Sequence, residues 1–119
     1  MSNICYEMED LTQNRGKKQP GMIYLAVKHE NVIFVSKMAI SMKTAQDIMK
    51  FGKEHLNTYT VNEMDAKKIA DIQILPLSII GINAPYKDPA HGIGFYQHWH
   101  TYKMHPGIAH SFFGSPRVV

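Results

Sequence analysis

The sequence contains one cysteine, Cys5, in 119 residues. A single thiol cannot form a disulfide within the chain, and it cannot build a zinc site from several thiolates. The sequence also lacks a run of about 18 apolar residues, the length that a membrane-spanning helix requires, so we expect no membrane span. Its first residues show neither a basic nor an apolar segment, so we expect no signal peptide and place any export information outside this chain.

Acidic residues are absent from the C-terminal quarter of the sequence. Residues 89–119 contain no Asp or Glu, and their Lys and Arg residues are Lys103 and Arg117. A magnesium site would need carboxylates, so this segment does not favour one. The whole chain has a net charge of +3 and an isoelectric point of about 9.0. This mild basic bias is compatible with phosphate binding but is not specific for it.

Length and composition indicate one folded domain. The chain is 45% hydrophobic and 19% charged, which is typical of a globular protein. Residues 1–21 are polar and end in the loop-forming run from Asn14 to Gly21, so we expect a tether or a poorly ordered segment there. We expect a single folded domain over residues 22–119.

Hydrophobic periodicity predicts the first elements of this domain. Two apolar runs within residues 22–35 flank a short polar break, which is typical of a β-hairpin. Over residues 41–56 apolar side chains recur at spacings of three and four, which predicts a helix. Thr60 and Glu63 form the pattern of a capping box and predict a second helix that ends near Ala70.

The C-terminal half is predicted to be mostly extended. Residues 72–80 are apolar but contain a proline, which suits an edge strand, and residues 81–89 have a loop composition. Aromatic and β-branched residues over 92–102 predict a strand, and a Pro-Gly turn over 103–107 leads to a return strand over 108–113. The predicted fold class is α+β: an N-terminal β-hairpin, two helices and a C-terminal histidine-bearing β-hairpin in a small antiparallel sheet.

Histidine is concentrated in this C-terminal hairpin. Five of the seven histidines lie within twenty residues, namely His91, His98, His100, His105 and His110. Because side chains alternate along a strand, Tyr96, His98 and His100 share one face. The turn brings His110 close to His98 or His100, and a register shift of one residue would bring Ser111 there instead.

Clustered imidazoles suit acid–base catalysis near neutral pH, because their ordinary pKa is about 6.5. In RNA cleavage one histidine takes the proton of the 2′-hydroxyl, and a second protonates the leaving oxygen. A cation such as Lys103 or Arg117 stabilises the phosphorane, and Tyr96 or Tyr102 stacks on a base. We therefore expect metal-independent catalysis, without a cofactor, by His98, His100, His110 and Ser111. The expected substrate-binding residues are Tyr96, Tyr102, Lys103, His105 and Arg117.

Two other uses of the same histidines remain open. Histidines two residues apart on a strand can share a zinc ion with a third histidine across the hairpin, which leaves a coordination position for water. The chain would then be a zinc-dependent nuclease or another hydrolase. Alternatively, the hairpin is a non-enzymatic binding module in which the histidines have a structural or pH-responsive role.

The C-terminal hairpin also resembles a known family. Residues 95–100 (Phe-Tyr-Gln-His-Trp-His) and 110–114 (His-Ser-Phe-Phe-Gly) are similar to motifs in the C-terminal toxin domains of bacterial polymorphic toxins, of the RHS and LXG kinds. The resemblance covers roughly residues 41–116. The chain departs from the usual pattern at residues 80–83 and in an additional His105-Pro106.

This resemblance implies that the single domain over residues 22–119 is a toxin-like catalytic domain, namely a nuclease and often a ribonuclease. It implies a secreted effector that acts in the cytoplasm of a target bacterium, with the export signal outside this chain. His98, His100 and His110 occupy the matched polar positions, with Ser111 alongside. A cognate acidic immunity protein would then cover the histidine face, and RNA would be the favoured substrate.

Overall fold

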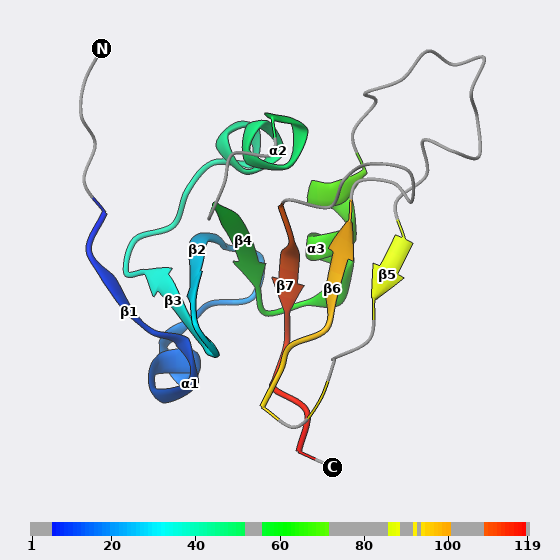
Figure 1. Ribbon diagram of the computed structural model, residues 1–119. Helices are drawn as coiled ribbons and strands as arrows, with labels where there is room; N and C mark the ends of the chain where they lie inside the picture. Colours follow the sequence, from blue (N-terminus) through cyan, green and yellow to red (C-terminus); the bar gives the residue numbers. More distant parts are fainter. Residues whose placement is uncertain are drawn as a thin grey trace, which may run out of the picture.

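The computed structural model describes residues 6–51, 56–71, 86–88, 92, 94–100 and 109–118. Within these residues seven strands form one sheet in the order β1-β3-β2-β4-β7-β6-β5 (Figure 1). The strands are β1 (Met8–Asp10), β2 (Ile23–His29), β3 (Val32–Ser36), β4 (Asn57–Thr60), β5 (Tyr86–Asp88), β6 (His98–His100) and β7 (Ser111–Phe113). The helices are α1 (Leu11–Asn14), the short 3-10 helix η1 (Arg15–Lys17), α2 (Met42–Phe51) and α3 (Glu63–Ala70). The predicted α+β class is confirmed.

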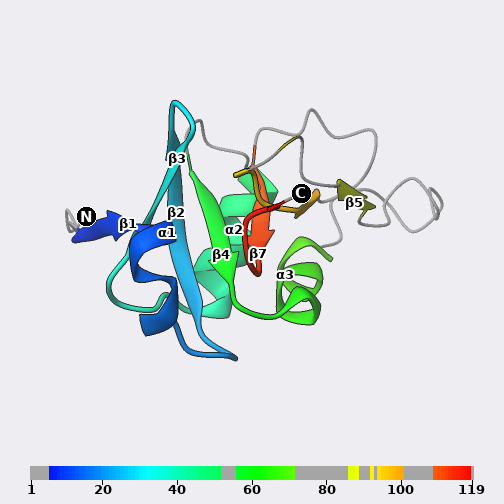
Figure 2. The same cartoon turned by 90° about the horizontal axis from the view of Figure 1, so that it is seen from below.

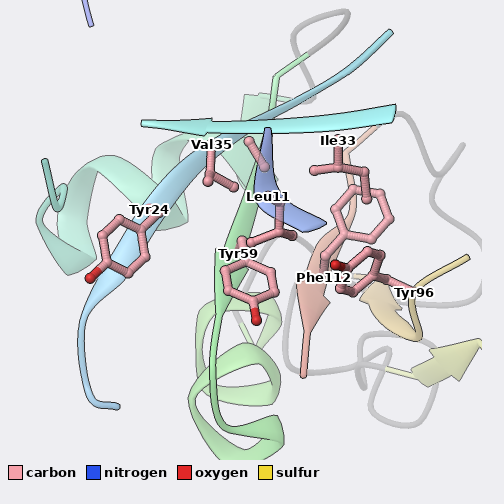
Figure 3. Packing of buried hydrophobic residues seen from close by; sticks show 8 residues of the cluster. Leu11, Tyr24, Ile33, Val35, Tyr59, Tyr96 and Phe112 are labelled. Atoms are coloured by element: carbon pink, nitrogen blue, oxygen red, sulfur yellow. The ribbon is translucent and has the colours of Figure 1, made fainter. Parts of the chain in front are cut away.

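Different helices cover the two faces of the sheet. α2 and α3 lie on one face and α1 lies on the other (Figure 2). The core under α2 and α3 includes Ile23 and Ile69. The core under α1 includes Leu11, Tyr59 and Phe112 (Figure 3). None of the helices in the described part of the chain is long and apolar enough to cross a membrane.

The predicted N-terminal hairpin and first long helix are confirmed. β2 and β3 pair antiparallel with Val27 opposite Phe34, and Glu30 in the connecting turn has a φ of 55°. The helix expected over residues 41–56 is present as α2. Ser41 caps its first turn, because its hydroxyl accepts a hydrogen bond from the Thr44 backbone N–H at 3.1 Å.

The segment expected to be a tether is folded over residues 8–18. β1 extends the sheet beside β3, and the Asp10 side chain caps α1. Leu11 is fully buried, and the buried Lys18 ammonium lies 2.7 Å from a carboxylate oxygen of Glu9. The hydrogen bond from Lys18 lowers the pKa of Glu9 below its ordinary value. The expectation was wrong for these residues because their polar composition concealed one core leucine and a buried ion pair.

Strand β4 was not predicted, although it is the central strand of the sheet. It pairs antiparallel with β2 and parallel with β7, so the sheet is mixed and not wholly antiparallel as expected. Thr60 belongs to this strand, and its hydroxyl donates to the carbonyl of Asn62. α3 begins at Glu63, and its N-cap Asn62 makes no side-chain capping bond. The predicted capping box was therefore wrong. The Asn-Thr-Tyr-Thr sequence of β4 lacks the alternation of a half-buried strand because all four residues are buried.

The predicted C-terminal hairpin is present, with strands shorter than expected. β6 and β7 pair antiparallel, with His98 opposite Phe112 and Trp99 opposite Ser111. A strand was expected over residues 92–102. Among the described residues of that range, only the three residues of β6 pair in the sheet. The turn expected over residues 103–107 lies outside the described residues.

A further strand, β5, lies where a loop was expected over residues 81–89. It pairs antiparallel with β6 at the edge of the sheet. Prolines at positions 85 and 89 gave this stretch the composition of a loop, yet they flank three residues that are free to pair. The extended segment expected over residues 72–80 lies outside the described residues.

Tyr59 makes the stability of this fold sensitive to alkaline pH. Its ring is fully buried, its hydroxyl donates to the carbonyl of Gly114, and burial raises its pKa to about 12 from an ordinary 10.0. The folded chain therefore keeps the phenol proton between pH 10 and 12, whereas the unfolded chain loses it. We expect the free energy of unfolding to fall by about 2–3 kcal/mol as pH rises through this window. Urea unfolding of the wild type and of Tyr59→Phe at pH 8, 10 and 11 measures it, and equal pH slopes would contradict it.

Candidate functional site

Strands β6 and β7 bring three histidine rings into contact. The ring centroids of His98 and His100 are 4.9 Å apart, those of His98 and His110 are 4.7 Å apart, and those of His100 and His110 are 5.0 Å apart. His98 and His100 are buried, and His110 is half-buried. The prediction that strand alternation and the antiparallel pairing of these segments bring the three residues together is confirmed.

Two neighbouring aromatic side chains, Trp99 and Phe112, lie on opposite faces of the sheet and show which face the histidines occupy. Trp99 points to the opposite face of the sheet, where it packs against the core under α3, and the Lys67 ammonium lies 5.3 Å from its ring centre. Phe112 lies on the histidine face, with its ring centroid 5.4 Å from that of His98 and stacked on that of His110 at 5.4 Å. An aromatic anchor on each face thus holds the histidine cluster in place.

Asn57 orients His110 from the neighbouring strand β4. The Asn57 side-chain oxygen accepts the backbone N–H of His110 at 2.9 Å and lies 3.0 Å from the ring Nδ1 of the same residue. Because that oxygen is an acceptor, Nδ1 carries the proton in the neutral ring and the lone pair is on Nε2. Sequence reasoning missed Asn57 because its strand was not predicted.

His98 is held in the same tautomer by the backbone. Its Nδ1 lies 3.3 Å from the carbonyl oxygen of Tyr96, which can only accept a hydrogen bond. The neutral ring therefore has its lone pair on Nε2, as in His110. Two of the three imidazoles thus have one nitrogen committed to an orienting contact and the other suited to act as a base or as a ligand.

A pocket opens beside the cluster on the same face of the sheet. It has a volume of about 440 Å³, part of which is open to solvent. Its lining comprises Lys28, Asn31, Ile33, Gly94, Phe95, Tyr96, His98, His110 and Phe112. His100 is not among these lining residues. A ligand in the pocket would therefore lie against His98 and His110.

Lys28 supplies the positive charge of the pocket, and sequence reasoning missed it. It follows Tyr24 and Ala26 along β2 at the alternating spacing that turns all three toward the histidine face. Its ammonium lies 5.5 Å from the ring centre of Phe95. Among the described residues the lining contains no carboxylate, so a bound anion would meet Lys28 without an opposing charge from them.

Ser111 does not join the histidines. It is fully buried on the opposite face, where its hydroxyl donates to the Ala66 carbonyl at 2.9 Å and accepts from Thr58 at 3.2 Å. The observed register, with Ser111 opposite Trp99, excludes the one-residue shift that would have placed it beside the imidazoles. The expectation that a hydroxyl joins the cluster was therefore wrong, and Ser111 links β7 to β4 and α3 instead.

The expected substrate-binding residues divide into three groups. Tyr96 is 3% exposed and its ring packs edge-on against Tyr59, so it forms part of the pocket floor and has no open face for a base. Arg117 is exposed, and its backbone pairs with Gly94 and Phe95 at the rim of the pocket. Tyr102, Lys103 and His105 lie outside the described residues.

Comparison of the chain with protein-family models, with curated proteins and with solved structures finds no match. The chemistry of the site is therefore the basis for any assignment. It combines a cluster of three imidazoles, two of which line a pocket, with the Lys28 ammonium and an aromatic wall in that pocket. These groups suit proton transfer, coordination of a transition metal and binding of an anionic substrate.

Proposed function

We propose that this chain is a toxin-like nuclease domain that cleaves phosphodiester bonds in RNA at the pocket beside the histidine cluster. The supporting observation is that Lys28, His98 and His110 line one pocket although they come from distant parts of the sequence. A phosphodiester needs a group that activates the nucleophile and a cation that stabilises the growing negative charge. The histidines serve the first need and Lys28 serves the second.

RNA is the favoured substrate because it contains its own nucleophile. The 2′-hydroxyl lies next to the phosphate that it attacks, so the protein only has to remove a proton and position the phosphate. The half-buried His110 lines the pocket and is oriented by Asn57. Lys28 would bind a non-bridging phosphate oxygen, and Phe95 beside it would exclude water from one side of the bound group.

The biological setting belongs to the same proposal and derives from the resemblance to polymorphic toxins. The domain would be the toxic part of a secreted effector that acts in the cytoplasm of a rival bacterium. An acidic immunity protein would neutralise it by covering the pocket. Lys28 and Arg117, both exposed and near the pocket, offer such a partner two positive charges.

Cleavage assays with the Lys28→Gln variant test this proposal. The purified chain is incubated with an end-labelled RNA oligonucleotide and with DNA of the same sequence. We expect faster cleavage of RNA, and a loss of about 10–100-fold in kcat/KM for Lys28→Gln, because a charge-assisted hydrogen bond to phosphate is removed.

The matched control is Lys68→Gln, which removes the same charge from an exposed position on α3, across the sheet from the pocket. It should cleave at the wild-type rate. Failure of the folded wild type to cut either nucleic acid would refute the proposal, as would equal rates for the two lysine variants.

A further inference from the structure

We infer that His98, His100 and His110 together bind a zinc ion. The inference concerns the histidine cluster itself, and only its catalytic consequence rests on the nuclease function proposed above. One ring nitrogen from each of the three residues lies within 4.8 Å of the other two. This cluster is therefore a candidate three-nitrogen site formed by two neighbouring strands.

The spacing of the rings suits a shared ion. With zinc–nitrogen distances of about 2.0–2.1 Å and tetrahedral angles, the centres of two ligating imidazoles lie roughly 5 Å apart. The observed centroid distances of 4.7, 4.9 and 5.0 Å match this value. A metal-free acid and base that act on opposite sides of one phosphate need room for that phosphate between them. Rings in mutual contact leave no such room, so the geometry favours an ion over the metal-free pair expected from the sequence.

The partners of the ring Nδ1 atoms also fit metal coordination. A metal-binding histidine usually donates its other ring N–H to a carbonyl or carboxylate, which fixes the tautomer and the ring orientation. The Nδ1 atoms of His98 and His110 face the Tyr96 carbonyl and the Asn57 side-chain oxygen, respectively. Both rings therefore have Nε2 as the nitrogen with the lone pair, which is the atom that would bind the ion.

The types of ligand atom in the cluster and in the pocket beside it favour a particular kind of metal ion. Imidazole nitrogen is a ligand for zinc and similar transition metals, whereas magnesium and calcium need several oxygen ligands. No carboxylate is found among the described residues that line the pocket. Three neutral ligands would leave the charge of the ion uncompensated and a fourth position for water on the pocket side. Water bound there would be acidic enough to ionise near neutral pH.

Zinc binding is tested on the purified full chain. The chain is stripped of metal by dialysis against a chelator, titrated with zinc chloride and passed through a gel-filtration column. Elemental analysis should find one zinc ion per chain, and cobalt chloride should instead give the visible absorption of a tetrahedral site. His100→Ala should weaken binding by more than the roughly 10–100-fold that follows loss of an outer-shell partner.

Two further variants control for misfolding and for nonspecific binding. His110→Ala removes a half-buried ligand, so it keeps the test valid where loss of the buried His100 unfolds the chain, as circular dichroism would reveal. His29→Ala removes an exposed histidine outside the cluster and should bind zinc as the wild type does. A folded wild type that retains no zinc would overturn the inference, and so would equal binding by His29→Ala and His110→Ala.

Cleavage assays on the same samples separate this inference from the proposed function. RNA cleavage that is lost on zinc removal and restored by zinc chloride would support both. Cleavage by a chain shown to be zinc-free would overturn the catalytic role of the ion and leave the nuclease proposal standing. Stoichiometric zinc in a chain that cuts no nucleic acid would support the metal site and refute the nuclease proposal.

Discussion

RNA cleavage is expected to fall by about 10²–10⁴-fold when His110 is replaced by alanine, with the fold retained. His110 is the half-buried histidine of the cluster and lines the pocket, so in the proposed mechanism its Nε2 would act either as the base or as a ligand of the activating ion. Loss of the ring removes the activation of the nucleophile in both cases. Single-turnover cleavage of labelled RNA by the wild type and the variant measures the effect.

Asn57→Ala and His29→Ala complete this experiment. Asn57→Ala keeps the imidazole of His110 but removes the oxygen that fixes its tautomer, so we expect an intermediate loss of about 10–100-fold. His29→Ala changes an exposed histidine that lies outside the cluster and should match the wild type. A rate for His110→Ala within threefold of that of His29→Ala would exclude a catalytic role for the cluster, because a group with such a role contributes at least about 10².

Leu11→Ala is expected to lower the free energy of unfolding by about 2–5 kcal/mol. Leu11 is fully buried. It packs beside Val35 and Tyr59 on the face of the sheet that also bears the histidines (Figure 3). Removal of its isobutyl group leaves a cavity between α1 and the sheet, and the surrounding side chains relax into it only in part. Urea unfolding followed by tyrosine and tryptophan fluorescence gives the difference.

Met38→Ala serves as the matched control for this cavity. Met38 is 74% exposed, so its replacement should change the free energy of unfolding by no more than about 0.5 kcal/mol. A loss below about 1 kcal/mol for Leu11→Ala, well under the about 2–5 kcal/mol that truncation of a core leucine costs, would show that residues 8–18 add little to the domain. The segment would then behave energetically as the tether that its composition suggests.

The elements that were predicted correctly from the sequence are those with a clear periodicity of apolar residues. The hairpin over residues 22–35 and the helix α2 have clear apolar periodicity, and both are present. Alternation along a strand also placed His98 and His100 on one face, with His110 opposite them. These predictions succeeded because each needs only the geometry of one element or one turn.

The missed features depend on contacts between distant segments. β4 has a polar sequence and is nevertheless buried, because its backbone pairs with both neighbouring strands and the Thr58 hydroxyl donates a hydrogen bond to that of Ser111. Lys28 and Asn57 reach the site only when β2 and β4 enter the same sheet as β7. Their separations from His110 in sequence are too long for any periodicity to reveal.

The position of β7 in the sheet determines when, during synthesis of the chain, the histidine cluster can form. Of the described strands β7 comes last along the chain, yet it lies in the interior of the sheet between β4 and β6. The ribosome synthesises β4 and β6 before β7. The position between these two strands therefore stays unfilled until residues 111–113 have emerged. His110 therefore joins His98 and His100 only after the chain has been synthesised through residue 113. If the proposed nuclease function holds, a chain synthesised only as far as β6 would lack His110 and would be inactive, so the proposed immunity partner would be needed only once β7 is complete.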